Sequence, residues 1–370
     1  MNPFLVTGYI SPEYFCNRQS EAKRLIESIT NNRNITLFSR RRIGKTALVH
    51  HTFYKLKKDK SVKLFYVDLY STNDVKEFTE TLAKAVLGEF DSGLKKLTES
   101  LKNIFGNLRP TISYDQLTGN PTLSFDWLTA KHADTTLENI FKYLNDSKQK
   151  IIIAFDEFQQ ITNYPRENIE ASLRTYIQNS PNITCIFSGS QNHLITSMFK
   201  DKSRPFYQSG ELFHLEKIPS ESYSKFISSL FRKGEKKLES ATINSILKIC
   251  ENHTYFVQYL CNRLYSLEIK NIDEQTITNT LIQILNENET HYFSYRNLLT
   301  RNQWTLLQAI AKENGIKQIT SQHFIKKHAL NTPSSVKSAL EVLLQKGLVY
   351  YANNVYEIDD IFFKIWLQRN

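Results

Sequence analysis

Ser39-Arg40-Arg41-Arg42-Ile43-Gly44-Lys45-Thr46 lies between a short apolar run, residues 34–39 (NITLFS), and an amphipathic run that begins at Lys45. The general phosphate-binding pattern is G-x-x-x-x-G-K-[ST], and this stretch matches it except that Ser39 replaces the first glycine. A strand, a tight loop and a helix in this order place backbone N–H groups at a helix N-terminus, where they can bind phosphate. The stretch therefore predicts a nucleotide site in an α/β domain.

Each position of the loop has a chemical role in this pattern. Gly44 lets the backbone approach a phosphate closely, Lys45 reaches the β- and γ-phosphates, and the Thr46 hydroxyl is placed to ligate Mg²⁺. The neighbouring arginines either add positive potential near the phosphates or face solvent and acidic groups, and the sequence leaves both open. The predicted nucleotide-binding residues are Arg41, Arg42, Ile43, Gly44, Lys45, Thr46 and Ala47.

A second motif is the apolar run Ile151–Phe155, which ends in the adjacent acids Asp156 and Glu157. Two carboxylates at the end of a buried strand need a cation to neutralise them. We predict that Asp156 holds Mg²⁺ and that Glu157 polarises the attacking water as general base. The guanine-reading pattern N-K-x-D does not occur, which favours ATP over GTP. Residues before the loop are candidates for holding the base: Tyr9, Ile10 and Phe15.

The hydrophobic pattern outside these motifs predicts strands that alternate with helices, and hence a parallel sheet with right-handed crossovers. Strands are expected at residues 34–39, 62–69, 151–155 and 183–187, with a hairpin inside an insertion at about 91–128. Strand signals fade after about residue 218. The predicted division is a P-loop domain at 1–218, a helical lid at 219–290 and a winged-helix domain at 291–370.

The winged helix is indicated by a helix–turn–helix pattern followed by two β runs around Asn353-Asn354. Thr332 is the expected N-cap of the candidate recognition helix, and Pro333 is its first residue. The outer face of this helix has little net charge for DNA phosphates, although the preceding helix adds Lys326, Lys327 and His328. Sequence-specific DNA binding, non-specific DNA contact and protein docking all remain open.

Composition restricts the class of protein. The chain has 370 residues, of which 41% are hydrophobic and 12% aromatic, and this excludes a mostly disordered chain. The net charge of +10 permits nucleic-acid or acidic partners. Four distant cysteines without metal-ligand spacing exclude a disulfide scaffold.

No signal-peptide pattern and no apolar run of ~20 residues occur, so we expect a cytoplasmic protein without a membrane partner. Glycine is scarce, with 11 residues, and Gly44 and Gly189 are the informative ones.

Together these motifs resemble the archaeal-type ATPases of the STAND and AAA+ P-loop group. The resemblance covers nearly the whole chain, and its pieces are FCNRQSE (15–21, where the family commonly has F-x-G-R-x-x-E), SRRRIGKTAL, IIIAFDEFQQI, IFSGSQNHLITSMF, HTYFVQYLCNRLY and EIDDIFFKIW. It implies a nucleotide domain, a helical lid and a winged helix. It also implies ATP-dependent switching or assembly, with a protein partner and homo-oligomerisation as further options.

The resemblance also assigns roles to individual residues. Ser188 or Ser190 lies at the sensor position, where a polar side chain contacts the γ-phosphate or the attacking water. Arg204 is either a charge-stabilising finger, in cis or on a neighbour, or a surface arginine, and Arg174 has the same two interpretations. Departures from the family pattern are Asn17 and Ser39 in place of glycines, and a helix start at 251–255 without glycine or proline. These departures leave binding intact and argue against fast turnover.

The sequence therefore predicts an ATP-binding protein that hydrolyses ATP with Mg²⁺ and couples it to conformational switching or partner assembly. The alternatives are a slow ATP sensor that docks a protein partner, and a DNA-binding AAA+ regulator. The presence of both acids favours the enzyme, and the nearly neutral recognition helix counts against the DNA regulator. The predicted catalytic residues are Glu157, Lys45, Ser190 and Arg204, and the predicted metal ligands are Thr46 and Asp156.

Overall fold

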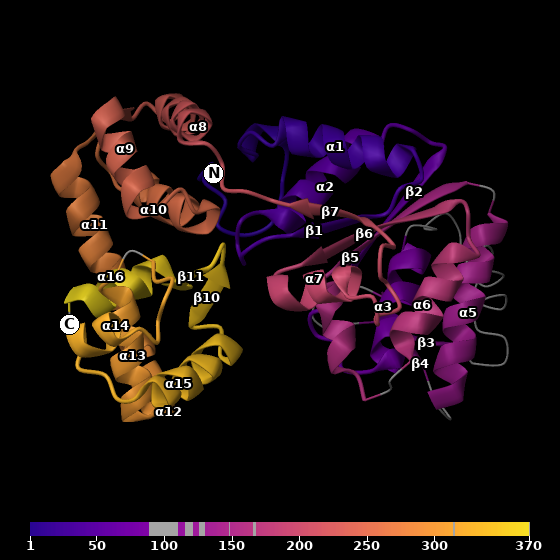
Figure 1. Cartoon of the computed structure of the whole chain (residues 1–370). Helices are drawn as coiled ribbons and strands as arrows, with labels where there is room; N and C mark the ends of the chain where they lie inside the picture. The colour runs from indigo at the N-terminus through magenta and orange to yellow at the C-terminus, as the bar shows by residue number, and fades with distance from the viewer. Residues whose placement is uncertain are drawn as a thin grey trace. The chain divides into compact units, whose positions relative to one another are not determined.

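A computed structural model describes residues 1–88, 110–114, 121–125, 130–147, 149–165, 168–313 and 315–369. The chain forms two compact units. One comprises Gly8–Glu216, and the other combines Met1–Thr7 with Lys217–Asn370 (Figure 1). The predicted boundary near residue 218 lies close to the passage between them, whereas the division of the second unit at residue 290 stays a prediction.

The first unit is built on a five-stranded sheet in the order β2-β5-β6-β1-β7. All neighbouring strands are parallel, as the sequence predicts. The edge strand β7 was not predicted, because its four residues are mostly half-buried and carry no continuous apolar run. The strands are β1 (Ile35–Phe38), β2 (Val62–Asp68), β5 (Lys150–Asp156), β6 (Ile183–Gly189) and β7 (Glu211–His214).

Helices cover both faces of this sheet (Figure 1). One face packs against α1 (Gln19–Thr30) and α2 (Lys45–Leu56). The other packs against α3 (Val75–Gly88), α5 (Ala130–Asp146), α6 (Ile169–Gln178) and α7 (Asn192–Lys200). Strand β5 shows why its run is apolar throughout: Ile151, Ile153 and Phe155 enter one core, whereas Ile152 and Ala154 enter the other.

The predicted hairpin is present as an antiparallel pair, β3 (Pro110–Tyr114) and β4 (Pro121–Phe125). The sequence predicts its turn at Thr118-Gly119-Asn120-Pro121; Pro121 instead begins β4, and the other three residues, like most of the insertion at about 91–128, lie outside the described residues.

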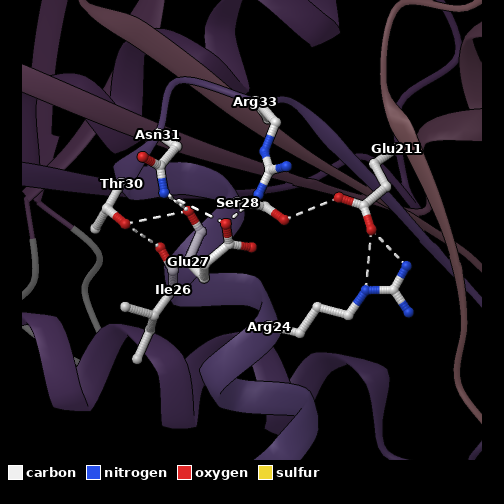
Figure 2. A network of polar contacts seen from close by, with 8 residues as sticks. All are labelled: Arg24, Ile26, Glu27, Ser28, Thr30, Asn31, Arg33 and Glu211. Carbon is white, nitrogen blue, oxygen red and sulfur yellow. Dashed lines mark hydrogen bonds and ion pairs between the residues drawn. The ribbon is translucent and has the colours of Figure 1, made fainter.

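A polar network fixes edge strand β7 to helix α1 (Figure 2). Arg24 Nε donates to Glu211 Oε1 at 3.0 Å, and Ser28 Oγ donates to Glu211 Oε2 at 3.0 Å. The guanidinium of Arg24 also lies over the Phe213 ring, 4.2 Å from its centroid. The hydrogen bond from Arg24 holds the pKa of Glu211 below its usual range, so the carboxylate is charged at neutral pH. These contacts align β7 beside β1, the strand that leads into the phosphate-binding stretch.

The second unit contains α8 (Ser220–Lys233), α9 (Ser240–Ile249), α10 (Thr254–Ser266), α11 (Glu274–Glu287) and α12 (Glu289–Leu298), with a short parallel pair β8 (Lys237–Leu238) and β9 (Asn271–Ile272). The chain's first residues belong here, although the predicted P-loop domain included them. Phe4 is fully buried, with its ring 4.9 Å from that of Phe231 and 5.9 Å from that of Tyr265. Asn262 Nδ2 donates to the Phe4 carbonyl at 2.7 Å, which ties the N-terminal segment to α10.

Just before α10, where the family often has a glycine, two other residues adopt the backbone conformation that favours glycine. Glu251 (φ 50°) and Asn252 (φ 56°) both adopt the left-handed conformation that favours glycine. His253 is 1% exposed, and its N–H donates to the Cys250 carbonyl at 2.8 Å. His253 is therefore part of the core of this unit.

The C-terminal region has the predicted winged-helix arrangement. It consists of α13 (Arg301–Ala311), α14 (Gln322–Lys327), α15 (Pro333–Gln345), the antiparallel pair β10 (Val349–Ala352) and β11 (Val355–Ile358), and α16 (Ile361–Arg369). Thr332 caps α15 by accepting a hydrogen bond from the Ser335 N–H at 3.3 Å. Asn353 (φ 52°) and Asn354 (φ 62°) form the left-handed two-residue turn of the wing. Across the described residues, helices with the length and apolarity required to cross a bilayer are absent.

Candidate nucleotide site

The loop between β1 and α2 has the backbone geometry that phosphate binding requires. Arg42 (φ 60°) and Gly44 (φ 104°) both adopt left-handed conformations just before the first turn of α2. Left-handed residues within such a turn aim successive N–H groups into one concavity, which binds anions. Ser39 keeps a negative φ, so a glycine is not needed there, and its Oγ donates to the Arg40 carbonyl at 2.9 Å.

Lys45 crosses this loop from the start of α2. Its Nζ donates to the carbonyls of Ser39 and Arg40, both at 3.3 Å, and the side chain is only 5% exposed. Burying an ammonium is tolerated because these oxygens replace part of its hydration. The loop and the cation therefore lie together.

The N-terminal motif at 15–21 supports the same loop. Arg18 is 2% exposed, and its guanidinium bonds to Glu21 Oε1 at 2.8 Å and to the Ile43 carbonyl at 3.5 Å. Asn17, which replaces the family glycine, has φ 54°, and asparagine is among the residues that best tolerate this conformation. The departure at Asn17 is thus compatible with the fold of the motif.

Asp156 ends β5 beneath the loop and is 4% exposed. Its Oδ2 accepts hydrogen bonds from Thr46 Oγ1 at 2.6 Å and from the Tyr66 hydroxyl at 2.8 Å. The structure thereby brings together Thr46 and Asp156, the two predicted metal ligands. A hydroxyl and a carboxylate are hard oxygen donors of the kind that Mg²⁺ uses alongside substrate phosphates and water. Within the described residues, there is no cluster of three or more His, Cys, Asp or Glu side chains that could hold a metal by itself.

Glu157 follows directly, in the left-handed conformation (φ 52°). Its Oε2 accepts hydrogen bonds from Ser190 Oγ at 2.7 Å and from Gln159 Nε2 at 2.5 Å. Of the two sensor candidates, Ser190 therefore reaches the predicted general base. Ser188 is fully buried in β6, and its Oγ has no hydrogen-bond partner among the described residues.

Residues 15–259 match the model of an ATPase domain found predominantly in Archaea, and residues 290–369 match a probable winged-helix domain. The chain belongs to this family of archaeal-type ATPases. A comparison with curated proteins finds no significant match.

Three solved structures have the same fold and align with nearly the whole length of this chain. A Walker-type ATPase of Pyrococcus abyssi is 18% identical, with a TM-score of 0.69 over 99% of both chains. The ORC2 protein of Aeropyrum pernix, solved with ADPNP and ADP, is 14% identical, with a TM-score of 0.59 over 100% of this chain and 98% of that one. The ORC1 protein of Aeropyrum pernix, solved with DNA, is 12% identical, with a TM-score of 0.54 over 97% and 94%.

Arg204 is predicted as a catalytic finger, but in this ATPase it pairs with a carboxylate on helix α6. Its guanidinium forms an ion pair with Glu170 in the first turn of α6. Burial raises the pKa of Glu170 although Arg204 opposes the shift. Arg174 also lies on α6, and it lines a cavity of about 210 Å³ together with Phe206 and Ser209. No described contact links either arginine to Asp156 or Glu157, so a finger role for them remains a prediction.

The residues predicted to hold the base form an aromatic group near α2. Tyr9 OH lies 3.0 Å from His51 Nδ1, and the Phe15 ring stacks on His51 with centroids 4.5 Å apart. Burial lowers the pKa of His51, so the imidazole is neutral at pH 7. Ile10 is 51% exposed. Base binding at these residues also stays a prediction.

Tyr66 is a site residue that the sequence did not single out. It lies on β2, whose register places Asp68 opposite Asp156. Burial, together with the neighbouring Asp156, raises the pKa of Tyr66, so its hydroxyl remains a hydrogen-bond donor. The available signal is that Tyr66 lies on the same face of the strand as Leu64 and Asp68, but the sequence alone does not show that β2 pairs with β5.

We expect Tyr66→Phe to raise the Mg²⁺ concentration needed for half-maximal ATP hydrolysis by about tenfold, the scale for groups that orient a metal ligand. The substitution keeps the ring and removes one of two donors on Asp156 Oδ2. The measurement is an ATPase titration with Mg²⁺ at saturating ATP. Tyr164→Phe is the matched control, since it removes a buried hydroxyl that bonds to Thr72 at 2.5 Å. An unchanged Mg²⁺ requirement in Tyr66→Phe would show that Asp156 is oriented without Tyr66, by Thr46 and by the Glu157 N–H that donates to Oδ1 at 3.0 Å.

Proposed function

We propose that this ATPase binds Mg·ATP at the loop of residues 39–46 and hydrolyses it with Glu157 as general base. The observation that carries the proposal is the 2.6 Å contact between Thr46 and Asp156, adjacent to the hydrogen-bonded carboxylate of Glu157. A hydroxyl at the loop, an acid at the strand end and a second acid beside it are the groups that this chemistry requires. The decisive experiment is ATP hydrolysis by wild type and by Glu157→Gln, which should retain bound ATP and lose hydrolysis.

In the proposed reaction, the N–H groups around Gly44 surround the β-phosphate, and Lys45 Nζ turns from the loop carbonyls to the β- and γ-phosphate oxygens. Thr46 and Asp156 hold Mg²⁺, which when bound neutralises phosphate charge. Glu157 accepts a proton from the attacking water, and Ser190 fixes the orientation of that carboxylate. Positioning and charge stabilisation supply most of the catalysis, as is general for phosphoryl transfer.

We further propose that the nucleotide state is coupled to movement between the two units. The chain passes between them twice, at residues 7–8 and 216–217. The first passage directly precedes Tyr9 and Ile10, the candidate base-holding residues. A nucleotide that orders these residues would restrict that passage. Hydrogen exchange at residues 8–16 with and without Mg·ATP tests this coupling, and unchanged exchange with nucleotide bound would contradict it.

The finger role of Arg204 belongs to the same proposal. An arginine that completes the site of a neighbouring copy would have to leave Glu170, and burial of Glu170 makes its charged form less favourable once the partner leaves. Specific activity that rises with protein concentration in wild type, and not in Arg204→Ala, would support this role.

DNA binding is the second candidate function, and the net charge of +10 favours it. The charges that would face a duplex are partly neutralised, however. Glu313 pairs with Lys327 Nζ at 2.6 Å and with His328 Nε2 at 2.7 Å. The ion pair with Lys327 reduces the positive charge of the helix before α15, which supports a protein-docking role for the winged helix.

If the ATPase meets DNA, we expect weak binding through phosphates, equal for random and specific duplexes. Affinity should fall steeply with salt, with a log–log slope of roughly −0.9 per neutralised phosphate. Charge reversal at Lys326 should weaken binding more than reversal at Lys327, which Glu313 already engages. Substitutions of Ser334 and Ser335 should do little. Fluorescence anisotropy at several salt concentrations is the measurement. Tight, sequence-dependent binding that persists in ~0.2 M salt would contradict this expectation and identify α15 as a base reader.

A further inference from the structure

Gln159 contacts the predicted general base and has no role in the mechanism so far. It lies in the 3₁₀ helix η2 (Phe158–Asn163) that follows β5, and it is 2% exposed. Its Nε2 donates to Glu157 Oε2 at 2.5 Å, the same oxygen that accepts from Ser190 at 2.7 Å. Because both donors converge on Oε2, the other oxygen, Oε1, is the one presented to an attacking water.

Aromatic packing holds the start of η2 in place. The Phe158 ring lies in an aromatic cluster, with centroids 4.5 Å from Phe187 and 5.3 Å from Phe206. This packing fixes the residue next to Gln159 and so limits the movement of the backbone that carries the amide.

Gly189, the last residue of β6, provides the space for the Gln159 side chain. A Cβ atom at residue 189 would lie 2.4 Å from Gln159 Oε1 and 3.2 Å from Ile195 Cβ, which is closer to the amide than atoms can pack. Gly189 does not have a positive φ, so backbone conformation does not call for glycine there, and a larger residue would have to displace the buried Gln159 amide. Gly189 thus serves to admit the Gln159 amide.

The orientation of that amide follows from its neighbours. Gln159 Oε1 is buried without a hydrogen-bond partner among the described residues. The opposite orientation would place this oxygen against the carboxylate of Glu157, and two acceptors would then repel each other. An amide held in one orientation at the cost of an unsatisfied buried oxygen indicates that its other end, the bond to Glu157, is the one that matters.

We propose that Gln159, seated against Gly189, is a positioning residue that orients the Glu157 carboxylate for ATP hydrolysis. The proposal rests on the proposed function, because it assigns a helper to the general base of that same site. It identifies why Gly189 and Gln159 occur together: removing either the amide donor or the space for it releases one of the two bonds that hold Oε2. Binding of ATP does not involve Gln159, so the effect belongs to the chemical step.

The test compares Gln159→Met with wild type. Methionine keeps the length and volume of the side chain but has no N–H donor. We expect kcat to fall by up to about 10²-fold, the scale for a displaced reacting group, while KM for ATP and the unfolding temperature stay near wild type. A purely structural role predicts the reverse, with unchanged kcat for Gln159→Met and lowered stability for Gln159→Ala.

A double-mutant cycle with Gly189→Ala tests the packing independently. In the wild-type background the new methyl collides with the amide, so kcat and the unfolding temperature should both fall. In the Gln159→Ala background the collision with the amide is gone and the tight contact with Ile195 remains, so Gly189→Ala should have a clearly smaller effect. Equal effects of Gly189→Ala in both backgrounds would overturn the inference, and so would a wild-type kcat in Gln159→Met. The proposed function would still stand if wild type hydrolysed ATP and Glu157→Gln did not. An inactive wild type would overturn both.

Discussion

Lys45→Ala should abolish detectable ATP binding by this ATPase. The substitution removes the cation that we propose binds the β- and γ-phosphates, and charge-assisted contacts to such a group are worth about 1.5–3 kcal/mol each. Two of them correspond to a loss of roughly 10²-fold or more in affinity. The measurement is the thermal shift with Mg·ATP, which should be large for wild type and absent for the variant.

The design needs a control because Lys45 is buried and bonds to the loop carbonyls of Ser39 and Arg40. Without ligand, Lys45→Ala should unfold at a slightly lower temperature and keep the far-UV circular dichroism of wild type. Lys55→Ala removes the same charge from the exposed last turn of the same helix, and it should bind ATP normally. If Mg·ATP stabilises Lys45→Ala as much as wild type, the loop is not the phosphate site.

Features encoded by neighbouring residues could be predicted from the sequence. The apolar run at 34–39 followed by Gly44-Lys45-Thr46 specifies a strand, a loop and a helix within a dozen or so residues. The run Ile151–Phe155 specifies a strand buried on both faces, and the acids at its end must then lie at the carboxyl edge of a parallel sheet. The meeting of Thr46 and Asp156 follows from these two local patterns and one general rule of topology.

Features that depend on strand order and on side-chain direction could not be predicted. Tyr66 reaches Asp156 across 90 residues of sequence, and only the pairing of β2 with β5 brings the two together. Glu170 meets Arg204 across 34 residues because α6 and the segment after α7 lie on one face of the sheet. In the sequence, Gly189 is conspicuous only because glycine is rare in this chain. The Gln159 amide lies where a side chain at residue 189 would be, and the hydrophobic pattern does not reveal this contact.

Glu157→Gln should leave ATP bound and lower its hydrolysis roughly 10²-fold or more, the scale for a positioned general base. Glutamine has the same shape as glutamate, and its amide oxygen can still accept the hydrogen bonds from Ser190 and Gln159. What the amide cannot do is take a proton from water. Binding and chemistry should therefore separate, with the thermal shift by Mg·ATP retained and the steady-state release of phosphate lost.

Two comparisons make this result specific. Glu211→Gln makes the same chemical change at the sheet edge, where the carboxylate bonds to Arg24 and Ser28, and it should hydrolyse ATP at the wild-type rate. Asp156→Ala should lose Mg²⁺-dependent affinity in addition to hydrolysis, because it removes a predicted metal ligand rather than the base. Equal phosphate release by wild type and Glu157→Gln, with ATP bound to both, would mean that the carboxylate held by Ser190 and Gln159 is not a base. The slow ATP sensor would then become the better account of this site, since a sensor requires the loop and Asp156 but no general base at residue 157.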